Sequence, residues 1–465
     1  MTRTPGNPAA ITQRGGAPYY YAPAAMPEPA LYTAAEGPAL AREPVMPRLL
    51  GFIASLYLAS VCFFSTASES VAWVAQAVAI GVAFAWLTIG LIIYGQGITW
   101  TKPITLYVGF LVWSLTGYIV TIHAERFTLT LTTTAKVVLI TWVMSQCIRT
   151  RRDLLICFFM VALTSVVVIA LGADEIKRSA TYRGDAGDSW AKDRASATLL
   201  GNANDLGIYG VTVVISGVFC LLGYRSVLVK GCGVLACAGG MYLVAASGSR
   251  TAMLGIAVGT VALYYYHLRQ LGTNSMARKV AVFFIAIMLM AGAAYFIAKL
   301  PFFFRVREMM TDRGAVEKEP RLIYFFRSLE VVAKNPIFGL GLNGFAMHRL
   351  GTNHRGEGQY THSSISESLS ATGLIGFALF YGVYFVLFMQ IRRLRKLDIP
   401  PKDRATLNMI MAYLLVVVAF SSVAVLFYHR LICPLLGACS GYVWYMEKMY
   451  GHRPAAAPQS VAAMS

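Results

Sequence analysis

The stretch at residues 335–376 reads NPIFGLGLNGFAMHRLGTNHRGEGQYTHSSISESLSATGLIG, a polar loop that ends in Thr361-His362-Ser363-Ser364 and runs directly into an apolar segment. Almost all of the remaining chain consists of long hydrophobic runs joined by short connections. The rest of the chain is therefore organised around this stretch, which is one of very few places with enough polar groups for chemistry.

Composition indicates the class of protein. The 465 residues are 57% hydrophobic and only 13% charged, whereas soluble proteins carry roughly 25% charged residues. The sequence therefore predicts an all-α polytopic membrane protein whose surroundings are a lipid bilayer. The net charge of +18 could suggest nucleic acid, but the basic residues lie between hydrophobic runs, where membrane topology is the simpler cause. We expect no nucleic-acid partner.

Apolar runs of about 20 residues, long enough to cross a bilayer as helices, divide the chain. About twelve such spans are predicted, near residues 49–68, 71–94, 103–123, 128–148, 154–172, 204–223, 227–246, 251–268, 279–298, 365–390, 406–428 and 430–446. The resulting organisation is a disordered cytoplasmic tail (1–47), nine transmembrane helices (48–298) with an outer loop at 173–203, a large helical periplasmic loop (299–363), three further helices (364–446) and a second cytoplasmic tail (447–465).

Basic clusters predict the orientation of these spans. If the N-terminus is cytoplasmic, Arg149-Thr150-Arg151-Arg152, Arg278-Lys279 and Arg392-Arg393-Leu394-Arg395-Lys396 all fall in short inner loops. Cationic short loops are retained on the cytoplasmic side of the membrane. The two long loops then lie on the outer side.

The large outer loop contains a predicted helix. Residues 321–334 carry apolar side chains at helical spacing, with Arg321, Tyr324 and Ser328 along another face. This helix could lie at the membrane interface with its apolar side down, or pack as a surface helix on the bundle. Pro336 and the glycines that follow it are expected to end the helix and let the backbone turn sharply.

No metal site is expected. The eight cysteines lie in or beside apolar runs without a CxxC pair, which indicates small buried side chains and no zinc site or disulfide framework. His348, His354 and His362 share the large loop, but their spacings of six and eight residues fit no regular helical ligand pattern. No carboxylate joins them in HExxH form.

Three side chains could carry chemistry. Arg250 lies between two apolar runs at the outer boundary, where an arginine either faces a polar cavity or phosphate or snorkels at a helix end. Arg321 could hold phosphate oxygens in a bidentate fork or be a solvated arginine at a helix end. His362 could accept a proton from a hydroxyl nucleophile, although a structural or solvent-facing histidine is the commoner case.

A second polar group leads into the span near 204–223. Asn202, Asn204 and Asp205 precede this span closely enough to cap its helix, which is the ordinary role of such residues at that position. They would also place polar groups at the mouth of an outer cavity.

Together these motifs resemble the O-antigen ligase and polymerase superfamily, over roughly residues 195–390. The matching elements are Gly201-Asn202-Ala203-Asn204-Asp205, Ser249-Arg250, Arg321 before Asn335-Pro336-x-x-Gly339-x-Gly341-x-x-x-Phe345, and His362-Ser363-x-x-x-Glu367 before Gly373-x-x-Gly376. The histidine of the family is commonly followed by asparagine, whereas Ser363 follows here. A serine still offers a hydrogen-bonding group, so the departure concerns only the positioning of the acceptor.

The resemblance implies a multi-pass glycosyltransferase of the bacterial inner membrane with its active site facing the periplasm. It implies a glycan donor carried on undecaprenyl diphosphate, a glycan or lipid A–core acceptor, and no metal, nucleotide sugar or other cofactor. In this reading Arg250 and Arg321 neutralise the departing diphosphate, and His362 is the base of an inverting displacement. Substrate-binding roles fall to Asn202, Asn204, Ser249, Ser363 and Glu367.

The sequence does not decide the subtype of glycosyltransferase, and two other functional classes are also compatible with it. A ligase, a polymerase and a protein glycosyltransferase all fit an outer loop of this length. A transporter or flippase of lipid-linked oligosaccharide is the main alternative, although the halves of the chain show no clear repeat and the spans carry few charges at mid-membrane. A membrane scaffold would leave the arrangement of Arg250, Arg321 and His362 as chance.

Overall fold

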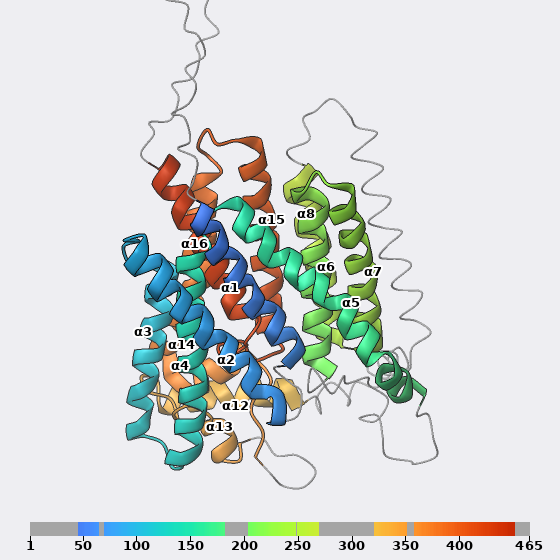
Figure 1. Cartoon of the computed structure of the whole chain (residues 1–465). Coiled ribbons are helices and arrows are strands. Elements are labelled where there is room, and N and C mark those ends of the chain that lie inside the picture. The colour runs from blue at the N-terminus through green and yellow to red at the C-terminus, as the bar shows by residue number, and fades with distance from the viewer. Residues whose placement is uncertain are drawn as a thin grey trace, which may run out of the picture. The chain divides into compact units, whose positions relative to one another are not determined.

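The computed structural model describes residues 45–64, 69–181, 203–247, 249–268, 320–350 and 358–451. Throughout these ranges the chain is helical and forms no β-strand (Figure 1). Seven of the described helices are long and apolar enough to cross a bilayer, and two shorter apolar helices accompany them. The predicted class, an all-α membrane protein, is therefore confirmed.

The helices follow one another in chain order and keep the labels of Figure 1. They are α1 (Val45–Phe64), α2 (Glu69–Ala85) with a π-helical continuation (Trp86–Ile93), α3 (Lys102–Thr116), α4 (Ala124–Cys147), α5 (Arg151–Thr181), α6 (Ala203–Gly223), α7 (Val227–Ser247), α8 (Arg250–Leu268), α12 (Pro320–Lys334), α13 (Gly344–Met347), α14 (Ser364–Leu394), α15 (Pro401–Ser421) and α16 (Ile432–Tyr450).

The hydrophobic runs predict the bounds of three helices closely and those of the others to within several residues. The runs at 204–223, 227–246 and 251–268 correspond to α6, α7 and α8 to within one residue at each end. The run at 279–298, most of the loop at 173–203 and part of the loop at 299–363 lie outside the described residues, so the total of about twelve spans stays a prediction. Helix α5 continues to Thr181, nine residues beyond the predicted end of its span.

Two of the predicted basic clusters, at residues 149–152 and 392–396, contact helix ends that the predicted topology places on one side. Arg151 at the start of α5 donates to the carbonyl oxygen of Gly223 at the end of α6 and to Oγ1 of Thr406 near the start of α15. The guanidinium of Arg395, after α14, lies 4.8 Å from the ring centroid of Tyr266 near the end of α8. The starts of α6, α8 and α14 therefore lie toward the opposite end, because each of these helices ends here.

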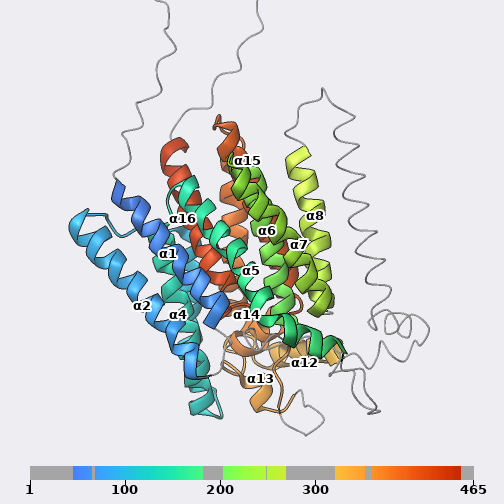
Figure 2. The ribbon, with the colours of Figure 1, turned by 45° about the vertical axis from the view of Figure 1, so that its right-hand side comes forward.

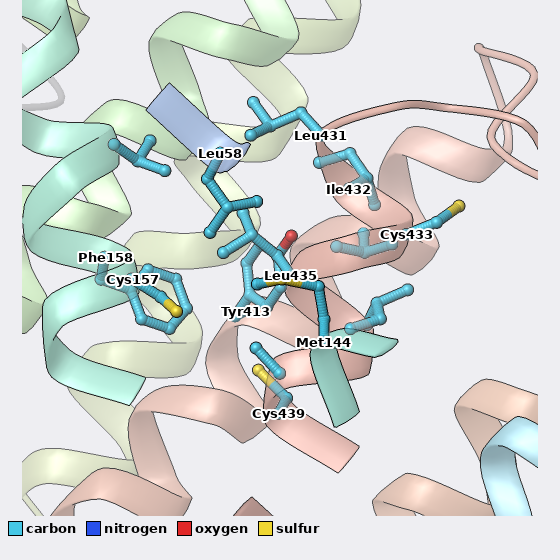
Figure 3. Packing of buried hydrophobic residues seen from close by; sticks show 14 of the residues in the cluster. Leu58, Met144, Cys157, Phe158, Tyr413, Leu431, Ile432, Cys433, Leu435 and Cys439 are labelled. Carbon is cyan, nitrogen blue, oxygen red and sulfur yellow. The ribbon is translucent and has the colours of Figure 1, made fainter. Parts of the chain in front are cut away.

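The core is a continuous layer of buried side chains between helices distant in sequence. Figure 3 shows Leu58 of α1, Met144 of α4 and Leu435 of α16 around Tyr413 of α15. The ring of Phe158 on α5 meets the ring of Tyr413 edge-on, with centroids 5.7 Å apart. This packing holds the long helices as one rigid scaffold.

Helix α12 confirms the helix predicted in the outer loop and crosses the lower end of the bundle (Figure 2). Tyr324 and Ser328 are buried, and the Tyr324 ring meets Phe345 of α13 at 5.6 Å between centroids. Phe326 and Leu329 are exposed. The face with Tyr324, Ser328 and Val331 thus packs on the protein, and the outward face mixes Phe326 and Leu329 with the charged Arg327 and Glu330.

The connection between α15 and α16 differs from the prediction. The hydrophobic pattern predicts a span that continues to residue 428 and a break at residue 429, whereas α15 ends at Ser421 and α16 begins at Ile432. Within the connection, the carbonyl oxygen of Ala424 and the N–H of Leu426 both bond Ser364 at the start of α14. The apolar residues of this segment pack against the protein outside a helix. Hydropathy alone does not distinguish such a buried connection from a membrane-spanning helix.

Helix α14 is broken at Gly373, whose φ of 66° and ψ of −167° no helix contains. The turn after α12 fills the break: the N–H of Leu340 donates to the carbonyl oxygen of Ser370, and the N–H of Leu374 donates to that of Pro336, both at 2.8 Å. Gly339 and Gly341 give this turn the positive φ values of 66° and 81°. The sharp backbone turn predicted from the glycines is confirmed.

Replacing Gly373 with alanine is therefore expected to destabilise the fold. A Cβ there would lie 2.2 Å from the carbonyl oxygen of Ile337, in a backbone conformation almost restricted to glycine. We expect Gly373→Ala to lower the free energy of unfolding by about 2 kcal/mol or more, measured as thermal unfolding in detergent. Gly231→Ala, at an exposed helical position with no atom within 4 Å of the new Cβ, is the control and should leave stability unchanged or slightly raised. Equal melting temperatures for the two variants would contradict the role of the break.

Candidate functional site

The predicted site residues His362, Ser363 and Glu367 come together at the start of α14. Ser363 is the N-cap residue, and its Oγ accepts from the N–H of Ser366. The buried carboxylate of Glu367 turns back and accepts from both the N–H and the Oγ1 of Thr361, each at 3.0 Å, through the same oxygen, Oε2. A carboxylate near the positive end of a helix is electrostatically favoured. The Ser363 cap and the bonds from Thr361 to Glu367 therefore both stabilise the start of α14.

His362 lies between these two anchored residues in a left-handed backbone conformation, with φ of 58°. Histidine is among the residues that enter this region more readily than most, at a cost of about 1 kcal/mol or more. Its ring is half-buried and lies 4.2 Å from the Tyr360 ring, centroid to centroid. The hydrogen bonds of Thr361 and Ser363 hold the backbone on both sides of His362, so the point from which the imidazole projects is fixed.

The connection between α15 and α16, residues 422–431, is hydrogen-bonded to the start of α14. The N–H and Oγ of Ser364 both donate to the carbonyl oxygen of Ala424, at 3.0 and 2.7 Å, and the N–H of Leu426 donates to Ser364 Oγ at 2.7 Å. All three bonds are buried or nearly so. The connection is thus part of the site and not a solvent loop.

Asn204 and Ser249 form a second predicted pair, at the starts of α6 and α8. Ser249 Oγ donates to Asn204 Oδ1 at 3.2 Å, and Ser249 is fully buried. Gly207 allows this approach, because a Cβ there would lie within 2.9 Å of Ser249 and of Ser247. The pair fixes the start of α8, where Arg250 is the first helical residue.

Tyr428, in the connection 422–431, interacts electrostatically with residues at the starts of both α14 and α6. Burial raises the pKa of its hydroxyl, and the carboxylates of Glu367 and Asp205, with the hydroxyl of Tyr360, raise it further. Glu367 belongs to α14 and Asp205 to α6, so one hydroxyl lies within electrostatic reach of both helix starts. Tyr428 is thus coupled electrostatically to the end of the bundle where α6 and α14 begin.

For three of the predicted site residues, the structure does not describe the position of the side chain. Arg250 and Arg321 are placed by their backbones alone, as the first residue of α8 and the second residue of α12, and Asn202 lies outside the described residues. Helical spacing puts position 321 on the face of α12 that also carries Tyr324 and Ser328, both of which pack on the bundle. His348 is described and exposed, while His354 is not described. In the described part of the chain, no three histidine, cysteine or acidic side chains cluster as metal ligands.

The sequence reasoning missed Tyr428 and His429, because it placed the first inside a span and the second at a helix break. The signal that could have found them is the polar triplet Tyr428-His429-Arg430 beside Ser421-Ser422, within an otherwise apolar run. Polar groups of this kind inside a hydrophobic run are costly in a bilayer unless they face protein.

The fold and the polar outer end define a helical membrane protein with a site at one end of its bundle. The sequence model of a family described as O-Antigen ligase matches residues 232–381, about a third of the chain. This segment runs from α7 through α8 and α12 into α14, and it contains Ser249, Arg250, Arg321, His362 and Glu367. This match supports the resemblance to the O-antigen ligase and polymerase superfamily that the motifs of the segment predict. No curated protein matches the chain at a significant level.

His429 predicts a pH dependence of stability. Its Nδ1 accepts from the N–H groups of Leu431 and Ile432, each at 3.3 Å, so the neutral ring caps the start of α16. Burial, followed by the charge of Arg430, lowers the pKa of His429 from 6.5 to about 4. The unfolded chain binds this proton near its ordinary pKa and the folded chain only near the lowered one, so the free energy of unfolding falls as the pH drops through that window.

The measurement is the melting temperature in detergent across this pH range, for the wild type and for His429→Asn. Asparagine keeps an acceptor near the position of Nδ1 but does not titrate. The variant should therefore lose less stability on acidification than the wild type does. The same slope in both proteins would show that His429 does not cause the effect.

Proposed function

We propose that the protein is an inverting, metal-independent glycosyltransferase at the periplasmic face of the bacterial inner membrane. Its donor would be a glycan on undecaprenyl diphosphate, and its product a ligated or polymerised surface glycan, as in an O-antigen ligase or an exopolysaccharide polymerase. The observation that carries the proposal is the start of α14, where His362 is held in a fixed left-handed conformation between anchored neighbours, within the segment that matches the O-antigen ligase family.

His362 is proposed as the general base. A half-buried imidazole beside the Tyr360 ring can take the proton of an acceptor hydroxyl as the hydroxyl attacks, provided that it lies within hydrogen-bonding reach. A fixed backbone favours this role, because much of the catalytic gain comes from holding base and nucleophile in register. The left-handed conformation at His362 is the kind of local strain that collects at functional sites.

Arg250 and Arg321 are proposed to hold the diphosphate. Both stand in the first turn of a helix, α8 or α12, where free backbone N–H groups and the helix dipole already favour an anion. A guanidinium adds a bidentate, permanently charged partner for phosphate oxygens. The hydrogen bond between Ser249 and Asn204 would keep the start of α8 in position beside α6.

The reaction then needs one displacement. The acceptor oxygen forms a bond to the anomeric carbon of the donor while the bond from that carbon to the diphosphate oxygen breaks. The electron pair leaves with undecaprenyl diphosphate, the proton goes to His362, and the anomeric configuration inverts. The charge that develops on the leaving group is stabilised by the arginines, so the proposed chemistry requires no metal or other cofactor.

Transport of a lipid-linked oligosaccharide is the second candidate, and the break in α14 favours it, since transporters often bind substrate at discontinuous helices. In this chain, however, the turn at residues 336–340 fills the break and uses its backbone groups. Trp113 of α3 stacks on Phe338 and donates to the carbonyl oxygen of Thr372 at 2.9 Å. Because the turn at 336–340 occupies the break, the break favours a rigid catalytic site over the moving gate of a transporter.

Glycan transfer in proteoliposomes tests the proposal. Undecaprenyl-diphosphate-linked oligosaccharide is supplied as donor, with lipid A–core or a second oligosaccharide as acceptor, in EDTA and without ATP. The wild type should form product, and His362→Ala, Arg250→Ala and Arg321→Ala should each lower the rate by about a hundredfold or more. His348→Ala, an exposed histidine between α13 and α14, is the matched control and should retain activity.

Two outcomes would contradict the proposal. Full activity of all three variants would remove the assigned roles. Movement of the donor to the other leaflet without any product would favour the transporter.

A further inference from the structure

Two polar atoms at the outer end lack partners and lie near each other. The hydroxyl of Tyr428 makes no hydrogen bond in the described part of the chain. Glu367 accepts both bonds from Thr361 through Oε2, and no described residue donates to its other oxygen, Oε1. Neither atom is among the fully buried unpartnered atoms of the described residues, so each keeps access to solvent and is available to a ligand.

The position of Tyr428 is fixed by the connection that carries it. Leu426, two residues earlier, bonds Ser364 at the start of α14, and the carbonyl oxygen of Phe427 accepts from the hydroxyl of Tyr107. The Tyr428 ring also meets that of Phe427 edge-on, with centroids 4.9 Å apart. These contacts hold Tyr428 beside the start of α14, which carries Glu367 and directly follows Tyr360 and Thr361. The negative charges of Glu367 and Asp205 add to the effect of burial in raising the pKa of its hydroxyl.

The chemistry of these groups favours a neutral polyol over a phosphate. The carboxyl groups of Glu367 and Asp205 would repel a diphosphate, whereas ionised carboxylates accept hydrogen bonds from sugar hydroxyls. The rings of Tyr360 and Tyr428 offer apolar faces against which the C–H face of a pyranose can pack, with a polar tip at the edge of each ring. The Tyr360 ring also touches His362, so a sugar here would bring a hydroxyl to the proposed base.

We propose that Tyr428, Glu367, Tyr360 and Asp205 form the acceptor-sugar subsite, in which Tyr428 donates a hydrogen bond to the acceptor and Glu367 Oε1 receives one. This assignment rests on the proposed glycosyltransferase function and adds to it the place of the acceptor. It separates the site into an acidic, aromatic half for the acceptor and a basic half, at the starts of α8 and α12, for the donor diphosphate.

Steady-state kinetics of Tyr428→Phe test the assignment. Phenylalanine keeps the ring and its contact with Phe427 but removes the hydroxyl. The KM for lipid A–core or for the oligosaccharide acceptor should rise about tenfold, as expected for a lost hydrogen bond in a substrate site, while the KM for the undecaprenyl-diphosphate donor stays unchanged. Glu367→Gln, which turns one oxygen into a donor, should act in the same direction. Tyr413→Phe removes a core hydroxyl that also lacks a partner among the described residues and should behave as the wild type.

Acceptors that lack single hydroxyl groups on their terminal sugar provide the sharper readout. One of them should react about tenfold less well with the wild type and lose nothing further with Tyr428→Phe, because the same bond is missing in both. Equal acceptor KM for Tyr428→Phe and wild type, or a rise in the donor KM alone, would overturn the subsite and leave the proposed function standing. Absence of transfer by the wild type to either acceptor would overturn both.

Discussion

The break in α14 and the turn that fills it are the constraint on which the outer end of the molecule depends. A helix interrupted inside an apolar bundle exposes peptide groups that water cannot reach, and each one left unpaired costs several kcal/mol. Here the N–H of Leu340 and the carbonyl oxygen of Pro336 take two of these groups, and the indole of Trp113 takes a third. The Asn335–Gly341 motif is thus explained by backbone pairing, with glycines where a Cβ would strike the partner segment.

This pairing sets the position of the helix start, and the helix start sets the position of His362. The first part of α14 carries many serines, whose hydroxyls bond the carbonyl oxygens one turn back, as Ser368 and Ser370 do. Such bonds let small polar side chains be buried without partners from other helices. The connection 422–431 then fixes the end of this segment through Ser364. Rigid neighbours on both sides allow one residue, His362, to keep an unfavourable backbone conformation.

Hydrophobic periodicity was sufficient to predict α6, α7 and α8 and the helix of the outer loop, because a bilayer leaves the backbone few other choices. It failed for residues 422–431, where Ala424 and Leu426 use their backbone groups in a tertiary contact that composition does not record. For the site, local motifs located His362, Ser363 and Glu367, and Asn204 with Ser249, since these lie at span entries. Tyr428 was missed because it joins the site only through the fold, from a segment some 60 residues away from Glu367 in sequence.

The distribution of charge at the outer end gives the proposed reaction a direction. The donor diphosphate and the neutral acceptor sugar must each bind in its own part of the site. Shape alone does not prevent a sugar from entering the part that binds phosphate. In the proposed site, carboxyl groups at the starts of α6 and α14 would exclude the anion from the acceptor side, whereas arginines at the starts of α8 and α12 would attract it to the other. His362, on the backbone between Thr361 and Ser363, would then stand at the acidic side, where it would meet a hydroxyl and not a phosphate. The same division explains why a single histidine could suffice as base: the leaving diphosphate needs charge compensation and not a proton, so the two halves of the site can be built from different kinds of residue.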